Sequence, residues 1–159
     1  MLFRSFGIAA IVDGNGSLVL DIDNNTITDF LLPVRAGARG GTGTASVTLQ
    51  NNDMTSSAVT GFGVVDLICG NGTVGETNSC CFNILNNDAS DPLMQGEYFI
   101  TMTTGTTCSI QGYGGAANDK AAIEAFVDAN QNSGSTTVCD AGSCGIGIVN
   151  YTNSTCSTP

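Results

Sequence analysis

The chain has 159 residues, of which 42% are hydrophobic and 11% charged, so it is long enough to bury a core and too apolar to be disordered. Four basic residues stand against fourteen acidic ones, which gives a net charge of −10. Nucleic acids and anionic lipids are bound through basic patches, so this charge argues against a role in binding either of them.

The first five residues, Met1–Ser5, are predicted to be a non-native N-terminal scar. They are what the DNA string GTGCTCTTCCGATCT encodes when GTG serves as the start codon, and that string resembles the end of a common sequencing adapter. A genuine N-terminus is the alternative. We therefore expect a single β-rich domain over residues 6–159 that has lost its natural N-terminus, including a signal peptide.

Three short strands are predicted next. Phe6–Val12 ends at a turn, Asp13–Gly16, and Ser17–Ile22 follows as a second strand. Asp23–Asn25 forms another turn before the third strand, Thr26–Leu32. Antiparallel pairing across such tight turns predicts a three-stranded meander.

The rest of the chain has the same alternation of short strands and polar turns. Val34–Thr44 is rich in glycine and is predicted to be a mobile loop. Tyr98–Thr104 is expected to pair back with Cys108–Gln111 across a turn, and no internal repeat of fixed period is evident. Further strands are expected at Ala45–Gln50, Ala58–Cys69, Cys81–Leu85, Thr137–Cys139 and Ile146–Tyr151. Together they predict a mainly β fold, a disulfide-stabilised antiparallel β-sandwich-like domain.

One helix is predicted, over Asp119–Ala129. Asn118 or Asp119 supplies the N-cap, and Lys120 is placed to pair with Glu124 one turn later. An apolar stripe at helical spacing is formed by Ala122, Ile123, Phe126 and Val127. The helix is expected to cover one face of a sheet.

The cysteines indicate disulfides and an oxidising compartment. Candidate disulfide residues are Cys69, Cys80, Cys81, Cys108, Cys139, Cys144 and Cys156. Cys139 with Cys144 would close a small loop, and Cys69 is expected to reach Cys80 or Cys81. The two neighbouring cysteines, Cys80 and Cys81, are expected to have different partners. The odd number of cysteines fits an N-terminal truncation that removed one partner thiol, and it fits equally well a thiol that is free or bonded to another chain.

Calcium is the candidate metal. In the segment Asp21–Asp29, side chains with oxygen atoms occupy positions 1, 3, 5 and 9, which are Asp21, Asp23, Asn25 and Asp29. The first three resemble the start of an EF-hand loop, but Thr26 stands where the turn needs glycine and Leu32 where the loop needs glutamate. A solvated turn is therefore the alternative. A second, weaker set of oxygens is offered by Asp13, Asn15 and Ser17.

The chain lacks residues that several catalytic mechanisms require. The chain has no histidine, which removes the Ser-His-Asp arrangement and the usual base for a catalytic cysteine. Asp88, Asp91 and Glu97 form an acidic cluster, and paired carboxylates can hydrolyse glycosides. The chain has no tryptophan and three tyrosines to bind a sugar, so a solvated loop is the expected role of this cluster.

The sequence thus predicts a non-enzymatic structural or adhesive domain of an extracellular or surface protein, such as a pilus, filament or surface-layer subunit. We expect a protein partner or self-assembly. The alternative is a secreted module that binds calcium or a glycan. No other cofactor is expected.

Overall fold

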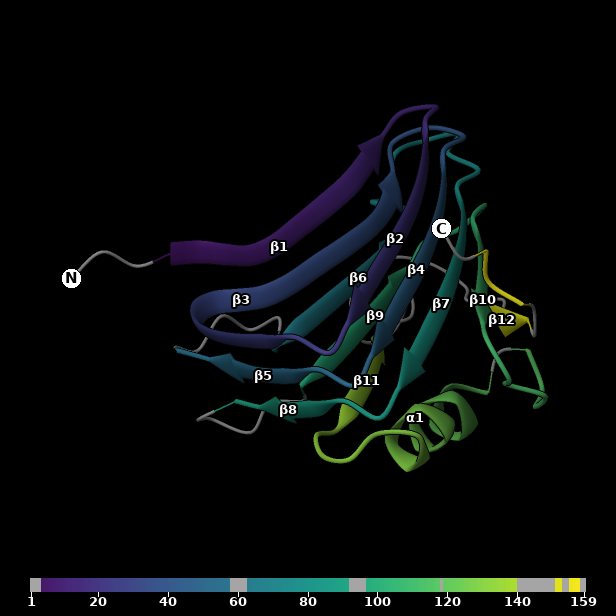
Figure 1. Ribbon diagram of the computed structural model, residues 1–159. Coiled ribbons are helices and arrows are strands. Elements are labelled where there is room, and N and C mark those ends of the chain that lie inside the picture. The colour runs from purple at the N-terminus through teal and green to yellow at the C-terminus, as the bar shows by residue number, and fades with distance from the viewer. Residues whose placement is uncertain are drawn as a thin grey trace.

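The computed structural model describes residues 4–57, 63–91, 97–117, 119–139, 151–152 and 155–157 (Figure 1). Short strands dominate this part of the chain, with one helix near its C-terminal end. The strands are β1 (Arg4–Asp13), β2 (Ser17–Asp23), β3 (Thr26–Arg39), β4 (Thr44–Gln50), β5 (Asp53–Ser56), β6 (Val65–Cys69), β7 (Ser79–Leu85), β8 (Asp88–Ser90), β9 (Tyr98–Met102), β10 (Thr107–Ile110), β11 (Thr136–Cys139) and β12 (Tyr151–Thr152), and the helix is α1 (Lys120–Ala129).

All strand pairs within the described ranges are parallel, and none joins strands that follow one another directly in the chain. One sheet has the order β12-β10-β7-β4-β2. The other sheet is built around β3, which is long enough to pair with two separate sets of strands. Its first part pairs with β5, and its second part pairs with β1 and β6.

The chain therefore winds as a β-solenoid, in which each turn of the chain, here called a coil, stacks on the one before it. Three faces result. The first face holds residues 26–30 of β3 with β5 and β8, the second holds β1, the rest of β3, β6, β9 and β11, and the third holds β2, β4, β7, β10 and β12. Such a fold is held together by contacts between neighbouring coils.

The core lies inside the coils and follows the strand period of two. On the third face, Leu20, Val47 and Phe82 occupy one register position, and the last two are 1% and 0% exposed. On the second face, Ala36, Leu67 and Ile100 align in the same way, and each is 0% exposed. Alternate side chains point outward.

A ladder of side-chain amides marks the corner between the third and first faces. Asn25, Asn52 and Asn87 stand at equivalent positions after β2, β4 and β7, and Gln131 follows α1. Nδ2 of each asparagine lies 2.9–3.1 Å from the side-chain oxygen of the next residue in the ladder. The residues before the three asparagines, Asn24, Asn51 and Asn86, share a left-handed φ of 56°, which asparagine tolerates better than most residues.

These observations correct the expected antiparallel sandwich. The mainly β composition and the short helix are confirmed, but the sheets are parallel. The turn after β1 exists, yet β1 pairs with β3 and β2 with β4, so there is no meander. Likewise β10 pairs with β7 and not with β9.

The prediction of a loop over Val34–Thr44 is also wrong for the first half of that segment. Residues 34–39 belong to β3, where Val34, Ala36 and Ala38 are buried. The glycines misled the prediction, because Gly37 adopts a φ of 143° within the strand and lies against the main chain of β6. Only the segment from Gly40 to Gly43 forms a turn.

The helix prediction is confirmed. Asp119 caps α1 by accepting a hydrogen bond from the Ala122 N–H at 3.1 Å. Lys120 Nζ lies 3.8 Å from Glu124 Oε1, and Ile123 and Val127 are buried. The helix occupies the stretch between β10 and β11, at the end of the stack opposite β1 (Figure 1).

Candidate functional site

Two disulfides fix the C-terminal half of the stack. Cys69 is bonded to Cys80, and Cys81 to Cys156, so the neighbouring cysteines have different partners as expected. The second bond joins residues 75 positions apart and fastens the segment around Cys156 against the outer side of β7. The expected loop closed by Cys139 and Cys144 lies outside the described residues.

Among the described cysteines, Cys108 is free and buried, and its burial raises the pKa of the thiol. A thiol held in its protonated form is a poor nucleophile.

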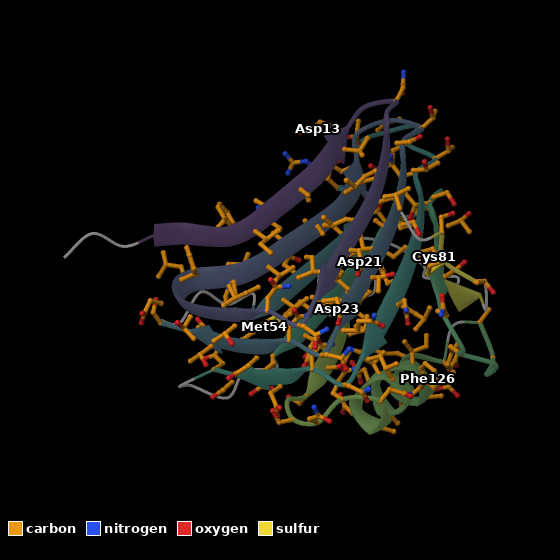
Figure 2. The ribbon with its side chains drawn as sticks, in the orientation of Figure 1. Asp13, Asp21, Asp23, Met54, Cys81 and Phe126 are labelled. Carbon is orange, nitrogen blue, oxygen red and sulfur yellow. A yellow bond between two sulfur atoms is a disulfide. The ribbon has the colours of Figure 1, made fainter. Side chains whose placement is uncertain are left out.

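The expected calcium ligands occupy the first coil. Asp21 and Asp23 are exposed on the outer side of β2 (Figure 2). Asp23 Oδ1 accepts a hydrogen bond from Asn51 Nδ2 at 2.9 Å, and the Asn25 amide belongs to the ladder. Asp29 lies on β3 at a bulge, with a φ of 65°. Within the described ranges no three acidic or thiol side chains gather closely enough to hold a metal, and the calcium site stays a prediction.

The second set of oxygens has a structural role. Asp13 forms an ion pair with Arg39, with Oδ2 and Nη2 2.9 Å apart. Asn15 Oδ1 accepts hydrogen bonds from the N–H and the hydroxyl of Thr42, both at 3.2 Å. These contacts join the first turn of the chain to the corresponding turn of the next coil.

The acidic cluster also joins coils. Glu97 Oε2 accepts hydrogen bonds from the N–H of Ser135 at 2.7 Å and from its hydroxyl at 2.9 Å. Asp88 is exposed and lies 3.5 Å from Asn132 Nδ2, while Asp91 is buried. The contact of Glu97 connects the residue before β9, and that of Asp88 connects β8, to the segment that follows α1.

The second face carries a hollow on its outer side, with a volume of about 170 Å³. It is lined by Arg35, Arg39, Asp66, Ile68, Gly70, Asn71 and Thr101. Arg35 and Asp66 are partners in the parallel register of β3 and β6, and Arg35 Nε lies 3.0 Å from Asp66 Oδ2. The Arg35 guanidinium also lies 5.9 Å from the ring centroid of Phe6.

The charges in this hollow are unequally exposed. The Asp66 side chain is 4% exposed and that of Arg35 30%. Burial raises the pKa of Asp66 to about 6, although the nearby Arg35 charge lowers it. A buried carboxylate with a shifted pKa, beside a guanidinium that faces a hollow, is an arrangement found at binding sites and in structural ion pairs alike.

Glu76 anchors the turn between β6 and β7. Its carboxylate accepts hydrogen bonds from the N–H groups of Gly40, Asn71 and Gly72, at 2.7–3.1 Å, and from the hydroxyl of Thr103. Burial by itself would raise the pKa of Glu76, but these hydrogen bonds together outweigh it and lower the pKa. Because its partners belong to three coils, Glu76 ties the turns on this side of the solenoid together.

A groove of about 240 Å³ lies on the outer side of the third face. Small side chains line it, including Ser17, Thr44, Ser46 and Ser79, and one wall is the segment containing Thr155 and Ser157. Ser46 donates a hydrogen bond to the Ser157 carbonyl at 2.8 Å. The groove is therefore formed partly by the segment that the Cys81–Cys156 bond holds in place.

Sequence reasoning missed the pairing of Arg35 with Asp66. No motif connects them, because their contact depends on the parallel register of two strands in successive coils. A signal was present, since Asp66 interrupts the apolar run Val64–Ile68 and a charged residue within a core strand needs a partner.

Comparison of this chain with protein-family models, with curated proteins and with solved structures finds no match. No described helix is both long and apolar enough to cross a membrane. The disulfides are compatible with an extracellular location.

Proposed function

We propose that the chain is a non-enzymatic structural module of an extracellular or surface-displayed protein assembly, of the kind that builds a pilus, a filament or a surface layer. The observation that carries the proposal is the continuous coil-to-coil stack, in which the amide ladder joins every coil to the next. A solenoid of this kind is a quasi-one-dimensional element, because each coil contacts only the neighbouring coils along its axis.

Two further features support a structural role. The Cys69–Cys80 bond joins β6 to β7 within one coil, and the Cys81–Cys156 bond fastens the segment around Cys156 to β7, so this part of the stack is held covalently as well as by hydrogen bonds. On the third face, the outward residues Thr44 and Gln50 of β4 and Ser79 and Asn83 of β7 are polar, uncharged and at least partly exposed, whereas Ser46 and Thr48 of β4 are buried. Such a surface suits contact with other protein chains, since little charge has to be desolvated.

The experiment for this proposal is photo-crosslinking of the chain in the native surface material, combined with thermal unfolding of the oxidised protein. A structural module is expected to give covalent adducts with neighbouring protein. Its unfolding temperature is expected to be the same in excess EDTA and in excess calcium. A chain that gives no adduct and unfolds at a higher temperature with calcium would contradict the proposal.

The second candidate is a secreted ligand-binding module, and the hollow on the second face favours it. Arg35 donates no hydrogen bond from its Nη atoms to any described residue, so these groups are open to a ligand. Asn71 and Thr101 add polar groups suited to a glycan. Retention on a glycan array that is lost in Arg35→Ala, but kept in the control Lys120→Ala on α1, away from the hollow, would favour this candidate.

A further inference from the structure

We propose that Cys80 has two alternative disulfide partners, Cys69 in its own coil and Cys108 in the next coil, and that thiol–disulfide exchange converts one bond into the other. The exchange moves a covalent link from the inside of one coil to the contact between two coils. It needs only the sulfur atoms of the chain itself, and it goes beyond the proposed structural function.

Cys80 and Cys108 are register partners on neighbouring strands. Cys80 belongs to β7 and Cys108 to β10, and these two strands pair in parallel. Both side chains lie in the core, where Cys80 is 2% exposed and Cys108 is 0% exposed. Neighbouring strands are about 4.8 Å apart, and disulfides form at Cα separations of about 4.4–6.8 Å. A bond between Cys80 and Cys108 is therefore within reach without rearrangement of the two strands.

The bond from Cys80 to Cys69 lies beside the strand that carries Cys108. The Sγ atom of Cys69 is 3.3 Å from the carbonyl oxygen of Thr107, the residue that precedes Cys108. Cys69 is itself 0% exposed and belongs to the same cluster of buried residues as Cys80 and Cys108. A thiolate attacks a disulfide only when it can reach one of the two sulfur atoms. The fold therefore brings the free thiol and the bond that it would attack into one cluster.

The position of Cys69 suits a free thiol. Its Sγ atom lies 3.3 Å from the carbonyl oxygen of Thr107 and 3.9 Å from that of Asn78. A thiol is a weak hydrogen-bond donor, so Cys69 would have acceptors in the core once its bond to Cys80 is broken. Chain entropy does not oppose the change, because Cys108 is farther from Cys80 along the chain than Cys69 is, and a longer loop restricts the unfolded chain more.

The exchange is balanced in atoms and electrons. The Sγ thiolate of Cys108 attacks the Sγ atom of Cys80, and a new S–S bond forms as the Cys69–Cys80 bond breaks. The electron pair of the broken bond leaves with the Sγ atom of Cys69, which takes up a proton from water, and the proton that Cys108 has lost passes to water. One disulfide and one thiol are present before and after, so no oxidant or reductant is consumed.

The closed stack keeps this exchange slow. Burial raises the pKa of the Cys108 thiol, and no charged group contributes to the shift, so the reactive thiolate is scarce. The residues paired with Cys108 in the sheet are Cys80 on β7 and Tyr151 on β12. Water reaches Cys108 when one of these strands separates from β10, and exchange then becomes faster. The resulting bond joins β7 to β10, so it holds together two coils that have begun to separate.

The experiment follows the free thiol in the oxidised 159-residue protein. The protein is incubated at mildly alkaline pH without added thiol, in urea below the unfolding transition, and is then acidified to stop the exchange. Unfolding in the presence of N-ethylmaleimide labels every free cysteine, and peptide mass mapping locates the label. Cys108→Ala is the matched control, because it removes the attacking sulfur and because alanine already occupies the same register position in β4, at Ala45.

We expect the label to start on Cys108 and to shift to Cys69 as a bond between Cys80 and Cys108 appears. The rate of this shift should rise about tenfold for each pH unit below the pKa of the thiol, because the thiolate is the attacking species. In Cys108→Ala, the label at Cys69 should be at least about tenfold lower. Label that stays on Cys108, label that moves to Cys80, or equal label at Cys69 in the control would overturn the proposal.

A second variant tests the alternative bond directly. Cys69→Ala leaves Cys80 without its partner in the structure, and after oxidation we expect a Cys80–Cys108 bond in a monomer, with neither cysteine open to the label. Free thiols at both positions, or a covalent dimer through Cys80, would overturn the proposal. Should this variant fail to fold, the exchange measured in the parent protein decides alone.

Discussion

Asn87 Oδ1 accepts two hydrogen bonds from one residue 35 positions earlier, from the main-chain N–H of Asn52 at 3.1 Å and from its Nδ2 at 2.9 Å. Both residues are buried, since Asn52 is 2% exposed and Asn87 is 0% exposed. Buried amides are costly when unpaired, so this relationship fixes how one coil sits on the next.

The first prediction concerns this ladder. Asn52→Ala is expected to lower the free energy of unfolding by about 2–4 kcal/mol, because it leaves buried partners such as the Ile22 carbonyl and Asn87 Oδ1 without a donor. The measurement is urea unfolding of the oxidised protein. Asn132→Ala, which removes an exposed amide that donates to the Asn86 carbonyl, is the control and should cost less than about 1 kcal/mol. Equal losses in the two variants would contradict the role of the ladder.

The second prediction compares the two disulfides. Removing the Cys81–Cys156 bond with paired serine substitutions is expected to cost about 4 kcal/mol, and removing the Cys69–Cys80 bond with paired alanines about 3 kcal/mol. The difference arises because the bonds close loops of 75 and 11 residues, and a longer loop restricts the unfolded chain more. Urea unfolding of both double variants tests the order. A larger loss for the Cys69–Cys80 variant would mean that packing around those sulfurs outweighs chain entropy.

The third prediction is a pH dependence from Asp66. The pKa of Asp66 is raised to about 6 in the folded state by burial, and an unfolded aspartate has a pKa of about 3.9. Between these values the folded state keeps a proton that the unfolded state has released, so stability decreases as the pH rises from about 4 to about 6. The contribution is of the order of 3 kcal/mol, fully present below pH 4 and lost above pH 6.

Asp66→Asn is expected to remove this decrease, because an amide does not titrate. The measurement is the difference between the unfolding free energies of the parent protein and the variant across this pH range. Asp21→Asn, on the exposed side of β2, is the matched control and should keep the slope of the parent protein. A parent and an Asp66→Asn variant with the same slope would refute the raised pKa.

The fourth prediction concerns the close approach of β3 and β6. A Cβ on Gly37 would lie 1.9 Å from the Ile68 carbonyl oxygen, and the φ of Gly37 is 143°. Gly37→Ala is therefore expected to cost about 3 kcal/mol or more. Gly75→Ala, at a φ of 82° with open space around it, is the control and should cost about 1–2 kcal/mol. Thermal unfolding of both variants measures the difference, and similar losses would argue against the clash.

Local features of the fold could be predicted from the sequence. The turns at Asn24 and Asn51 and the helix over residues 120–129 follow from local chemistry, namely left-handed asparagines, a capping aspartate and an apolar stripe. The different partners of Cys80 and Cys81 followed from their adjacency. These features depend on residues that are close in the chain.

The strand pairing could not be predicted in this way. An alternating strand such as residues 45–50 has the same pattern in an antiparallel sandwich and in a solenoid face, because both bury one side. The coils also differ in length, since successive ladder residues are 27, 35 and 44 positions apart, so no fixed period marks the repeat. The hollow at Arg35 and Asp66 depends on that pairing and was missed with it.

The parallel register is the central claim, and a cysteine pair tests it most directly. Ser17 and Thr44 are register partners whose hydroxyl oxygens lie 3.0 Å apart. We predict that Ser17→Cys with Thr44→Cys forms a disulfide on oxidation, identified by peptide mass mapping, because register partners on adjacent strands lie within disulfide reach. The offset pair Ser17→Cys with Thr48→Cys should not. Failure of the first pair, or equal bonding of both, would contradict the parallel solenoid.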